Sequence, residues 1–99
     1  MEKSTPHCKL SVVKSLVEGG HVRATGSAFI GARDLGIRDL AGMCAVVMAL
    51  TSKNFYKSMT THADHTVWQD VYRARTRYGS VYLKLTVIDD VLIVSFKEL

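Results

Sequence analysis

The sequence has little of what marks several specialised classes of protein. It contains one proline and two cysteines in 99 residues, and 47% of its residues are hydrophobic. This composition is typical of a folded globular chain and not of a disordered one. Cys8 and Cys44 are too few for a disulfide framework, and both stand among residues of helical pattern, so we interpret them as packing residues.

Long hydrophobic runs are also missing. The longest uninterrupted apolar stretch, residues 43–50, is far shorter than the roughly 20 residues that a membrane-spanning helix needs. The opening residues, MEKSTP, lack the apolar core of a signal peptide. We therefore expect a cytoplasmic protein with no membrane segment.

The motifs of common nucleotide and nucleophile chemistry are absent. Gly19, Gly20 and Gly26 lack the rest of a Walker or dinucleotide-binding pattern. No nucleophile elbow, and no serine or cysteine paired with a directing histidine, is evident. We expect no nucleotide cofactor, and nothing in the sequence calls for another cofactor.

Acidic residues are a modest minority. Nine Asp and Glu stand against thirteen Lys and Arg, which gives a net charge of +4. Such an excess permits binding to nucleic acid but fits many other proteins. The placement of the basic residues is therefore more informative than their number.

The first half of the chain has the period of helices. Apolar residues recur at helical spacing in three segments, separated by glycines and by an extended link at residues 21–23. Capping residues bound these segments. The expected boundaries are Thr5-Pro6 to Gly19-Gly20, Thr25 or Ser27 to Gly36, and Asp39 to Leu50.

The second half has the period of strands. From about residue 55, β-branched and aromatic residues alternate with polar ones, which predicts strands at residues 54–61, 66–77, 81–88 and 91–97. Helices followed by consecutive antiparallel strands predict one α+β domain over residues 1–99. Its N-terminal helices should pack on one face of a mainly antiparallel sheet.

Asp89 and Asp90 separate the last two expected strands, and the simplest connection is a two-residue turn. This register places residue 88 opposite 91 and Tyr82 opposite Lys97. One face of the hairpin is then wholly apolar and should carry the helices. Its expected members are Val81, Leu83, Leu85, Val87, Leu92, Val94 and Phe96.

The reverse face gathers polar side chains at one end. By alternation it holds Tyr82, Lys84 and Lys97, and a turn near residues 78–80 would place Arg75 or Arg77 opposite Tyr82. Arg73 and Gln69 share the parity of these arginines. Arg and Lys can hold phosphodiester oxygens, Tyr and Gln can supply hydrogen bonds, and an aromatic ring can stack on an unpaired base. The same pattern also fits an ordinary solvated sheet face.

Three smaller features have alternative interpretations. His62, Asp64 and His65 resemble a metal or acid-base group, but such loop residues are more often solvated, so no metal site is expected. Trp68 and Tyr72 are interpreted as packing anchors. Lys57 lies in an edge-like strand, where it either discourages edge pairing or reaches the polar cluster.

Several strings together resemble one known family. They are MEKSTPH, DLAGMC, FYKSMTTHADHTVWQDVY and GSVYLKLTVIDDVLIVSFKE, and they run nearly from end to end of the chain. These strings are similar to those of the MqsR motility quorum-sensing regulator toxins. The resemblance implies a RelE-like fold and an mRNA interferase that cuts single-stranded RNA at GCU-type sequences.

The resemblance also implies partners and site residues. The partner would be an MqsA-like antitoxin with a zinc-binding domain and a helix-turn-helix domain, and DNA would be reached only through it. The family's proposed active-site residues correspond to Lys57, Gln69, Tyr82 and Lys97. Arg73 and Arg75 fit the basic strand of the family, and with Lys84 they are expected to bind RNA. Arg77 has no place in the family motif.

A ribonuclease without metal can use the ribose 2′-hydroxyl as nucleophile, with proton transfers at both oxygens. A lysine or tyrosine acting as base needs a lowered pKa, and clustered positive charge would lower it for Lys57. The expected roles are Lys57 or Tyr82 in proton transfer, Arg75 and Lys97 on the phosphate, and Gln69 orienting the substrate.

Two functions of other kinds stay open on the sequence. The basic face could belong to a non-catalytic module that binds RNA or a protein partner. It could also serve mainly as a docking surface for the antitoxin, by strand addition at an edge.

Overall fold

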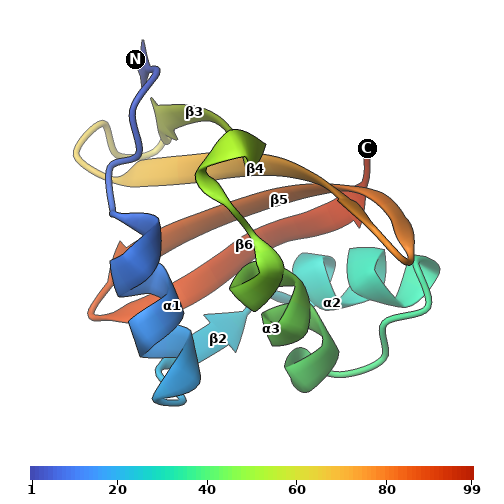
Figure 1. Ribbon diagram of the computed structural model, residues 1–99. Coiled ribbons are helices and arrows are strands. Elements are labelled where there is room, and N and C mark those ends of the chain that lie inside the picture. The colour runs from blue at the N-terminus through green and yellow to red at the C-terminus, as the bar shows by residue number, and fades with distance from the viewer.

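The computed structural model describes residues 1–99 as three helices and one six-stranded sheet (Figure 1). The strands lie in the order β1-β3-β4-β5-β6-β2. The strands are β1 (Glu2–Lys3), β2 (Val22–Ala24), β3 (Phe55–Thr60), β4 (Trp68–Thr76), β5 (Gly79–Ile88) and β6 (Asp90–Glu98). The helices are α1 (Leu10–Glu18), α2 (Gly26–Asp34) and α3 (Leu40–Ala49), with a 3-10 turn at Ser52–Asn54.

The predicted fold class is confirmed. Strands β3 to β6 are consecutive antiparallel neighbours, and β1 joins them antiparallel to β3. Only β2 is parallel to its neighbour, β6. The chain is therefore α+β with a mainly antiparallel sheet, and no helix in it is long and apolar enough to cross a membrane.

Side-chain caps begin two of the three helices as predicted. The Thr25 hydroxyl accepts a hydrogen bond from the Ala28 N–H at 3.1 Å, and the Asp39 carboxylate accepts one from the Gly42 N–H at 2.8 Å. Each cap satisfies a backbone donor that has no partner inside the helix. The sequence therefore determines these two starts locally.

The predicted start of the first helix at Thr5-Pro6 is wrong. The helix begins at Leu10, because the N–H groups of His7 and Cys8 donate instead to the buried Asp70 carboxylate, at 2.9 and 3.0 Å. Cys8 accordingly lies outside the helix, although both cysteines do pack against the core. The segment before α1 is irregular, and its contacts with Asp70 tie the N-terminus to the sheet.

The last hairpin differs from its predicted register near the turn. Asp89 forms the apex with a φ of 65°, and Ile88 pairs with Asp90 instead of Val91. A bulge then leaves Val94 without a partner and restores the pairing of Tyr82 with Lys97. A one-residue shift moves a strand's side chains to the opposite face.

This shift changes which residues face the helices. Leu92 and Val94 were predicted on the apolar face, but Val91 and Ile93 occupy it with 0% exposure. Beyond the bulge the alternation is reversed again, so Phe96 reaches the core as predicted. The pairing of Tyr82 with Lys97 is thus correct, whereas the pairing of residue 88 with 91 is not.

The preceding hairpin turns earlier than predicted. Thr76 pairs with Gly79, so the turn residues are Arg77 and Tyr78. The Thr76 hydroxyl accepts from the Tyr78 N–H at 3.0 Å and donates to the Gly79 carbonyl at 2.9 Å, which fixes this turn. Arg73, and not Arg75 or Arg77, therefore lies opposite Tyr82.

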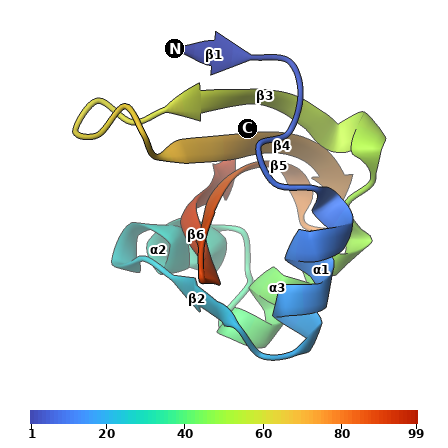
Figure 2. The same ribbon diagram turned by 90° about the vertical axis from the view of Figure 1, so that its left-hand side faces the viewer.

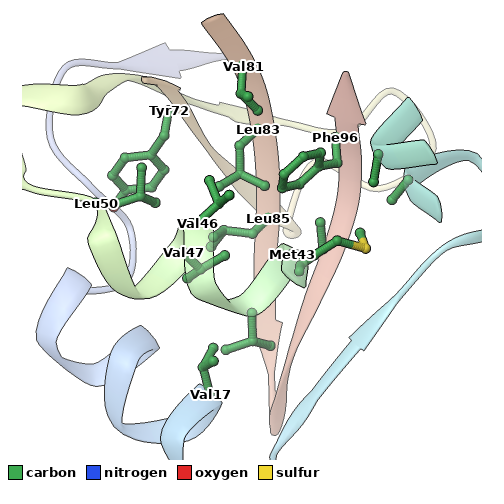
Figure 3. Packing of buried hydrophobic residues seen from close by; sticks show 14 of the residues in the cluster. Val17, Met43, Val46, Val47, Leu50, Tyr72, Val81, Leu83, Leu85 and Phe96 are labelled. Carbon is green, nitrogen blue, oxygen red and sulfur yellow. The ribbon is translucent and has the colours of Figure 1, made fainter. Parts of the chain in front are cut away.

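The core lies between one face of the sheet and the helices. Figure 3 shows Met43, Val46 and Val47 of α3 directed toward Leu83, Leu85 and Phe96 of the sheet. Helix α1 lies beside α3 on the same side, while α2 runs alongside β6 (Figures 1 and 2). The opposite face of the central strands carries no helix.

Strand β2 and then helix α2 lie along the same edge of β6. The Thr25 N–H donates to the Ile93 carbonyl at 3.0 Å, and the Thr25 hydroxyl donates to the Val94 carbonyl at 2.8 Å. Six residues later, a Cβ at Gly31 would overlap the Phe96 carbonyl and approach the Lys97 Cα to 3.3 Å. This close packing fixes the backbone that carries Lys97.

Candidate functional site

Register places most of the predicted site residues on the sheet face that no helix covers. Residues that pair across antiparallel strands share a face, and so do alternate residues of one strand. We call this surface the basic face. Its members are Lys57, Met59, Gln69, Val71, Arg73, Arg75, Tyr82, Lys84, Ser95 and Lys97.

One row of the basic face crosses four strands. Lys57 of β3 pairs with Val71 of β4, Val71 pairs with Lys84 of β5, and Lys84 pairs with Ser95 of β6. Val71 is 0% exposed, yet it is not part of the core cluster on the helical side. Val71 thus lies between two lysines in the sheet, and long charged side chains often cover apolar surface with their alkyl stems.

The next row carries Arg73, Tyr82 and Lys97. Tyr82 pairs with both, and the Lys97 ammonium lies 5.2 Å from the centre of the Tyr82 ring. Two of the four residues that the family resemblance suggested as catalytic therefore lie side by side. The cation stands near the electron-rich face of the ring, which is an attractive arrangement.

Tyr56 lies beside the basic face, and sequence reasoning missed it. It is the extra residue of a bulge in β3, between the pairs Phe55–Tyr72 and Lys57–Val71. The Arg73 guanidinium carbon lies 3.7 Å from the centre of the Tyr56 ring, which is 44% exposed. Strict alternation along a strand cannot reveal a bulge, so no sequence signal pointed to Tyr56.

Lys57 forms an ion pair that no local sequence pattern indicates. Its ammonium donates to Glu2 Oε2 at 2.8 Å, and Glu2 comes from β1 at the other end of the chain. This hydrogen bond raises the pKa of Lys57 and lowers that of Glu2. The expectation that neighbouring positive charge lowers the pKa of Lys57 is therefore wrong, because a carboxylate contacts it directly.

The pKa of Lys84 is shifted in the opposite direction. Burial lowers the pKa of Lys84, and the nearby charges of Lys97 and Lys57 lower it further. A lysine that is partly desolvated between two other lysines loses its proton more readily than a free one. The basic face therefore holds two ammonium groups with pKa values shifted in opposite directions.

Gln69 and Arg75 lie at the two ends of the basic face. Gln69 is half-buried opposite Met59, and Arg75 is exposed opposite Ser80, toward the β4–β5 turn. Arg75 also lines a hollow of about 270 Å³ against α3. The most compact group is therefore Lys57, Arg73, Tyr82, Lys84 and Lys97.

Among the alternative groups named from the sequence, Asp64, Tyr72 and Trp68 have structural roles. Asp64 Oδ1 accepts hydrogen bonds from the N–H and hydroxyl of Thr66 at 2.8 and 2.6 Å, which holds the loop before β4. These bonds lower the pKa of Asp64. Tyr72 is fully buried in the core, and Trp68 packs under His7, so both are packing anchors as predicted.

No group of three His, Cys, Asp or Glu side chains is placed to hold a metal ion. The chemistry that this surface offers is that of cations, a phenol and an amide. Cations stabilise the charge of a phosphodiester, and an amine of lowered pKa can accept a proton.

Comparison with known proteins agrees with the resemblance in the sequence. Residues 5–98 match the model of a family described as motility quorum-sensing regulator, toxin of MqsA. The chain is also 62% identical to mRNA interferase toxin MqsR of Escherichia coli (strain K12) over 98 residues, which is 99% of each chain. This protein therefore belongs to the motility quorum-sensing regulator toxin family.

Proposed function

We propose that this protein is an mRNA interferase, an endoribonuclease that cuts single-stranded mRNA at GCU-type sites without a metal. The curated relative is named as an mRNA interferase toxin, and the identity covers nearly all of both chains. The observation that carries the proposal is the basic face, where Lys57, Arg73, Tyr82, Lys84 and Lys97 converge from four strands. An open, positively charged sheet face can receive an unpaired strand with its phosphates exposed.

The reaction that fits these groups begins with the ribose 2′ oxygen. This oxygen attacks the adjacent phosphorus and forms a P–O2′ bond, its proton passes to a base, and the P–O5′ bond breaks. The departing 5′ oxygen takes up a proton. The products are a 2′,3′-cyclic phosphate and a 5′-hydroxyl, and water is not consumed in this step.

The pKa shifts of Lys57 and Lys84 favour different roles for these two lysines. Lys84 has the lowered pKa, so at neutral pH its amine is neutral in a larger fraction of molecules than that of Lys57. We assign Lys84 as the base for the 2′-hydroxyl. Lys57 and Lys97 stabilise the phosphate charge, and the Tyr82 hydroxyl donates a proton to the departing 5′ oxygen.

Three further residues bind and orient the RNA in this proposal. Arg73 and Arg75 contact phosphates along the strand, and Gln69 orients a nucleotide through its amide. Arg73 stacks on Tyr56, so a base that stacks on the exposed part of the Tyr56 ring lies beside the scissile phosphate.

The proposed partner is an antitoxin of the MqsA kind, since the matched family is described as the toxin of MqsA. In this proposal the antitoxin keeps the enzyme inactive in the cytoplasm, and DNA is reached only through it. The whole chain is one catalytic domain, in which the helices support the sheet that cleaves RNA.

A defined RNA tests the activity, the specificity and the nucleophile together. An end-labelled RNA with one GCU should be cut there, whereas the same RNA with that site changed should stay intact. A single 2′-deoxy substitution on the 5′ side of the cut should block cleavage, and mass spectrometry should find a 2′,3′-cyclic phosphate. Addition of EDTA should leave the rate unchanged.

Variants connect the activity to the basic face. Tyr82→Phe and Lys97→Ala should each lower the cleavage rate about a hundredfold or more, because proton transfer and charge stabilisation each contribute on that order. Glu18→Gln, at the exposed end of α1, is the control for a change of charge elsewhere. Wild-type rates in both site variants would refute the assignment.

A further inference from the structure

The short strand β1 brings the N-terminus into contact with the basic face. Glu2 pairs with Met59 and Lys3 with Ser58, so β3 is an internal strand and not the edge of the sheet. The terminal ammonium donates to the Thr60 hydroxyl at 3.1 Å, and the Thr60 N–H donates to the Met1 carbonyl at 2.9 Å. Figure 2 shows β1 along the outer side of β3.

Alternation separates the two side chains of β1. Glu2 shares the face of Met59, which is the basic face, and its carboxylate contacts the Lys57 ammonium at 2.8 Å. Lys3 points to the other face, where its ammonium lies 4.1 Å from the centre of the Trp68 ring and 3.0 Å from His7 Nδ1. One residue of β1 therefore reaches the proposed site, and its neighbour anchors the strand.

We propose that Glu2 is a positioning residue for RNA cleavage: it fixes the Lys57 ammonium as a permanent charge that binds the phosphate and takes no part in proton transfer. This inference rests on the proposed function. Lys57 keeps only 27% of its side chain exposed, so the ion pair restricts a lysine that is already packed against its neighbours. Only Oε2 of Glu2 contacts the lysine, which leaves the other ammonium hydrogens for a phosphate.

The surroundings of Lys57 supply no other carboxylate contact. The groups that face it are Tyr56 on its own strand, Arg73 on β4, Tyr82 and Lys84 on β5, and Lys97 farther across on β6. Without Glu2, Lys57 would meet only cations and phenols, and its pKa would fall because the hydrogen bond that raises it most is lost. Glu2 thus keeps Lys57 protonated in a surface that is otherwise rich in positive charge.

The proposal predicts a specific kinetic pattern for Glu2→Gln. The turnover number should fall about ten- to a hundredfold, as expected for a misplaced catalytic group. KM should stay unchanged or decrease, because removing an acidic group does not weaken RNA binding. Glu2→Asp keeps the charge on a shorter side chain and should recover part of the lost rate.

Lys3→Met is the matched control for the strand itself. It removes the contacts of β1 on the opposite face and leaves the Glu2–Lys57 pair in place. Hydrogen exchange of the β1 amides reports how well each variant holds the strand. Equal losses of turnover in Lys3→Met and Glu2→Gln would show that β1 acts only as structure and would overturn the proposal.

A second measurement does not depend on activity. In the wild type, the NMR signal of the Lys57 Cε, assigned with Lys57→Met, should titrate with a pKa above the ordinary lysine value of about 10.5. In Glu2→Gln it should titrate at a lower pH. An unchanged Lys57 titration would overturn the proposal, whereas a shifted titration in a protein that cuts no RNA would count against the proposed function alone.

Discussion

Lys84 is the residue whose chemistry depends most on its neighbours. It lies between Val71 and Ser95 in the sheet, and burial together with Lys97 and Lys57 lowers its pKa. A lysine on an open surface would stay protonated at neutral pH and could only bind phosphate. The difference between these two roles can be measured.

If Lys84 is the base, the turnover number should rise with pH up to the lowered pKa of Lys84, because only the neutral amine accepts a proton. The guanidinium introduced by Lys84→Arg keeps its proton and its positive charge, so it cannot act as a base. RNA should therefore bind normally, while the turnover number falls about 10²- to 10⁴-fold. Wild-type turnover with an unchanged pH profile in Lys84→Arg would assign this residue to phosphate binding.

Tyr72 presents a different kind of buried group. Its side chain is 0% exposed, and its hydroxyl has no hydrogen-bond partner. Burial, with smaller contributions from Asp70 and Cys8, raises the pKa of Tyr72 to about 12. A buried hydroxyl without a partner costs about 1 to 3 kcal/mol.

Tyr72→Phe should therefore raise the free energy of unfolding, by about 1 kcal/mol, in urea denaturation at pH 7. The advantage should widen above pH 10, because the unfolded tyrosine ionises there while the folded one keeps its proton, which destabilises only the wild type. A lower urea midpoint in the variant would mean that the hydroxyl contributes favourably to the core.

At the scale of elements, α2 determines the backbone position of Lys97. Its Gly31 lies against the Phe96 carbonyl, so no side chain fits there. Ala28 and Ala32 of the same helix are buried in the core cluster on either side of this contact. Small residues on one helix face thus allow the helix to cover the edge of β6 beyond β2.

Gly31→Ala should lower the free energy of unfolding by about 1 to 3 kcal/mol or more, because the new methyl group forces helix and strand apart. Its cleavage rate should also fall, through displacement of Lys97. Gly26→Ala is the matched control, since Gly26 begins the same helix and a Cβ there meets nothing within 4 Å. Equal stabilities of the two variants would contradict the close packing.

The bulges are the second feature at this scale. One bulge in β6 returns Lys97 to the side of Tyr82 after the turn at Asp89, and one in β3 adds Tyr56 above Arg73. Each inserts one residue into a regular ladder and so re-aims the side chains beyond it. The composition of the basic face therefore depends on two single-residue irregularities.

At the scale of the whole molecule, charge distribution matters more than net charge. The net charge is +4, but the basic face alone carries Lys57, Arg73, Arg75, Lys84 and Lys97. The carboxylate of Glu2, in contact with Lys57, offsets part of this positive charge. The salt dependence of RNA binding counts the cations that remain free to neutralise phosphates.

The affinity for a 2′-deoxy, non-cleavable GCU strand should fall with salt, and each phosphate contact adds about 0.7 to the slope of log affinity against log salt. Lys97→Gln should reduce the slope by about that amount, and Glu2→Gln should increase it. Lys14→Gln removes the same charge from α1 and should leave the slope unchanged. Equal effects of Lys97→Gln and Lys14→Gln would mean that only net charge matters.

The sequence by itself determined the local features of this protein. Two helix caps, the four main strands and their antiparallel order follow from short-range patterns, because capping, turn formation and alternation act between residues close in the chain. The pairing of Tyr82 with Lys97 was also predictable, although the intervening turn and bulge were each missed and compensate each other.

Only the tertiary structure decided how the candidate site is assembled. Glu2 reaches Lys57 across 55 positions of sequence, and Asp70 holds the N–H groups of His7 and Cys8 from a strand more than 60 residues away. No local pattern records such contacts, because they exist only once β1 has joined β3. The opposite pKa shifts of Lys57 and Lys84 also depend on the fold, since the hydrogen bond with Glu2 raises the pKa of Lys57, whereas burial, with the charges of Lys97 and Lys57, lowers that of Lys84.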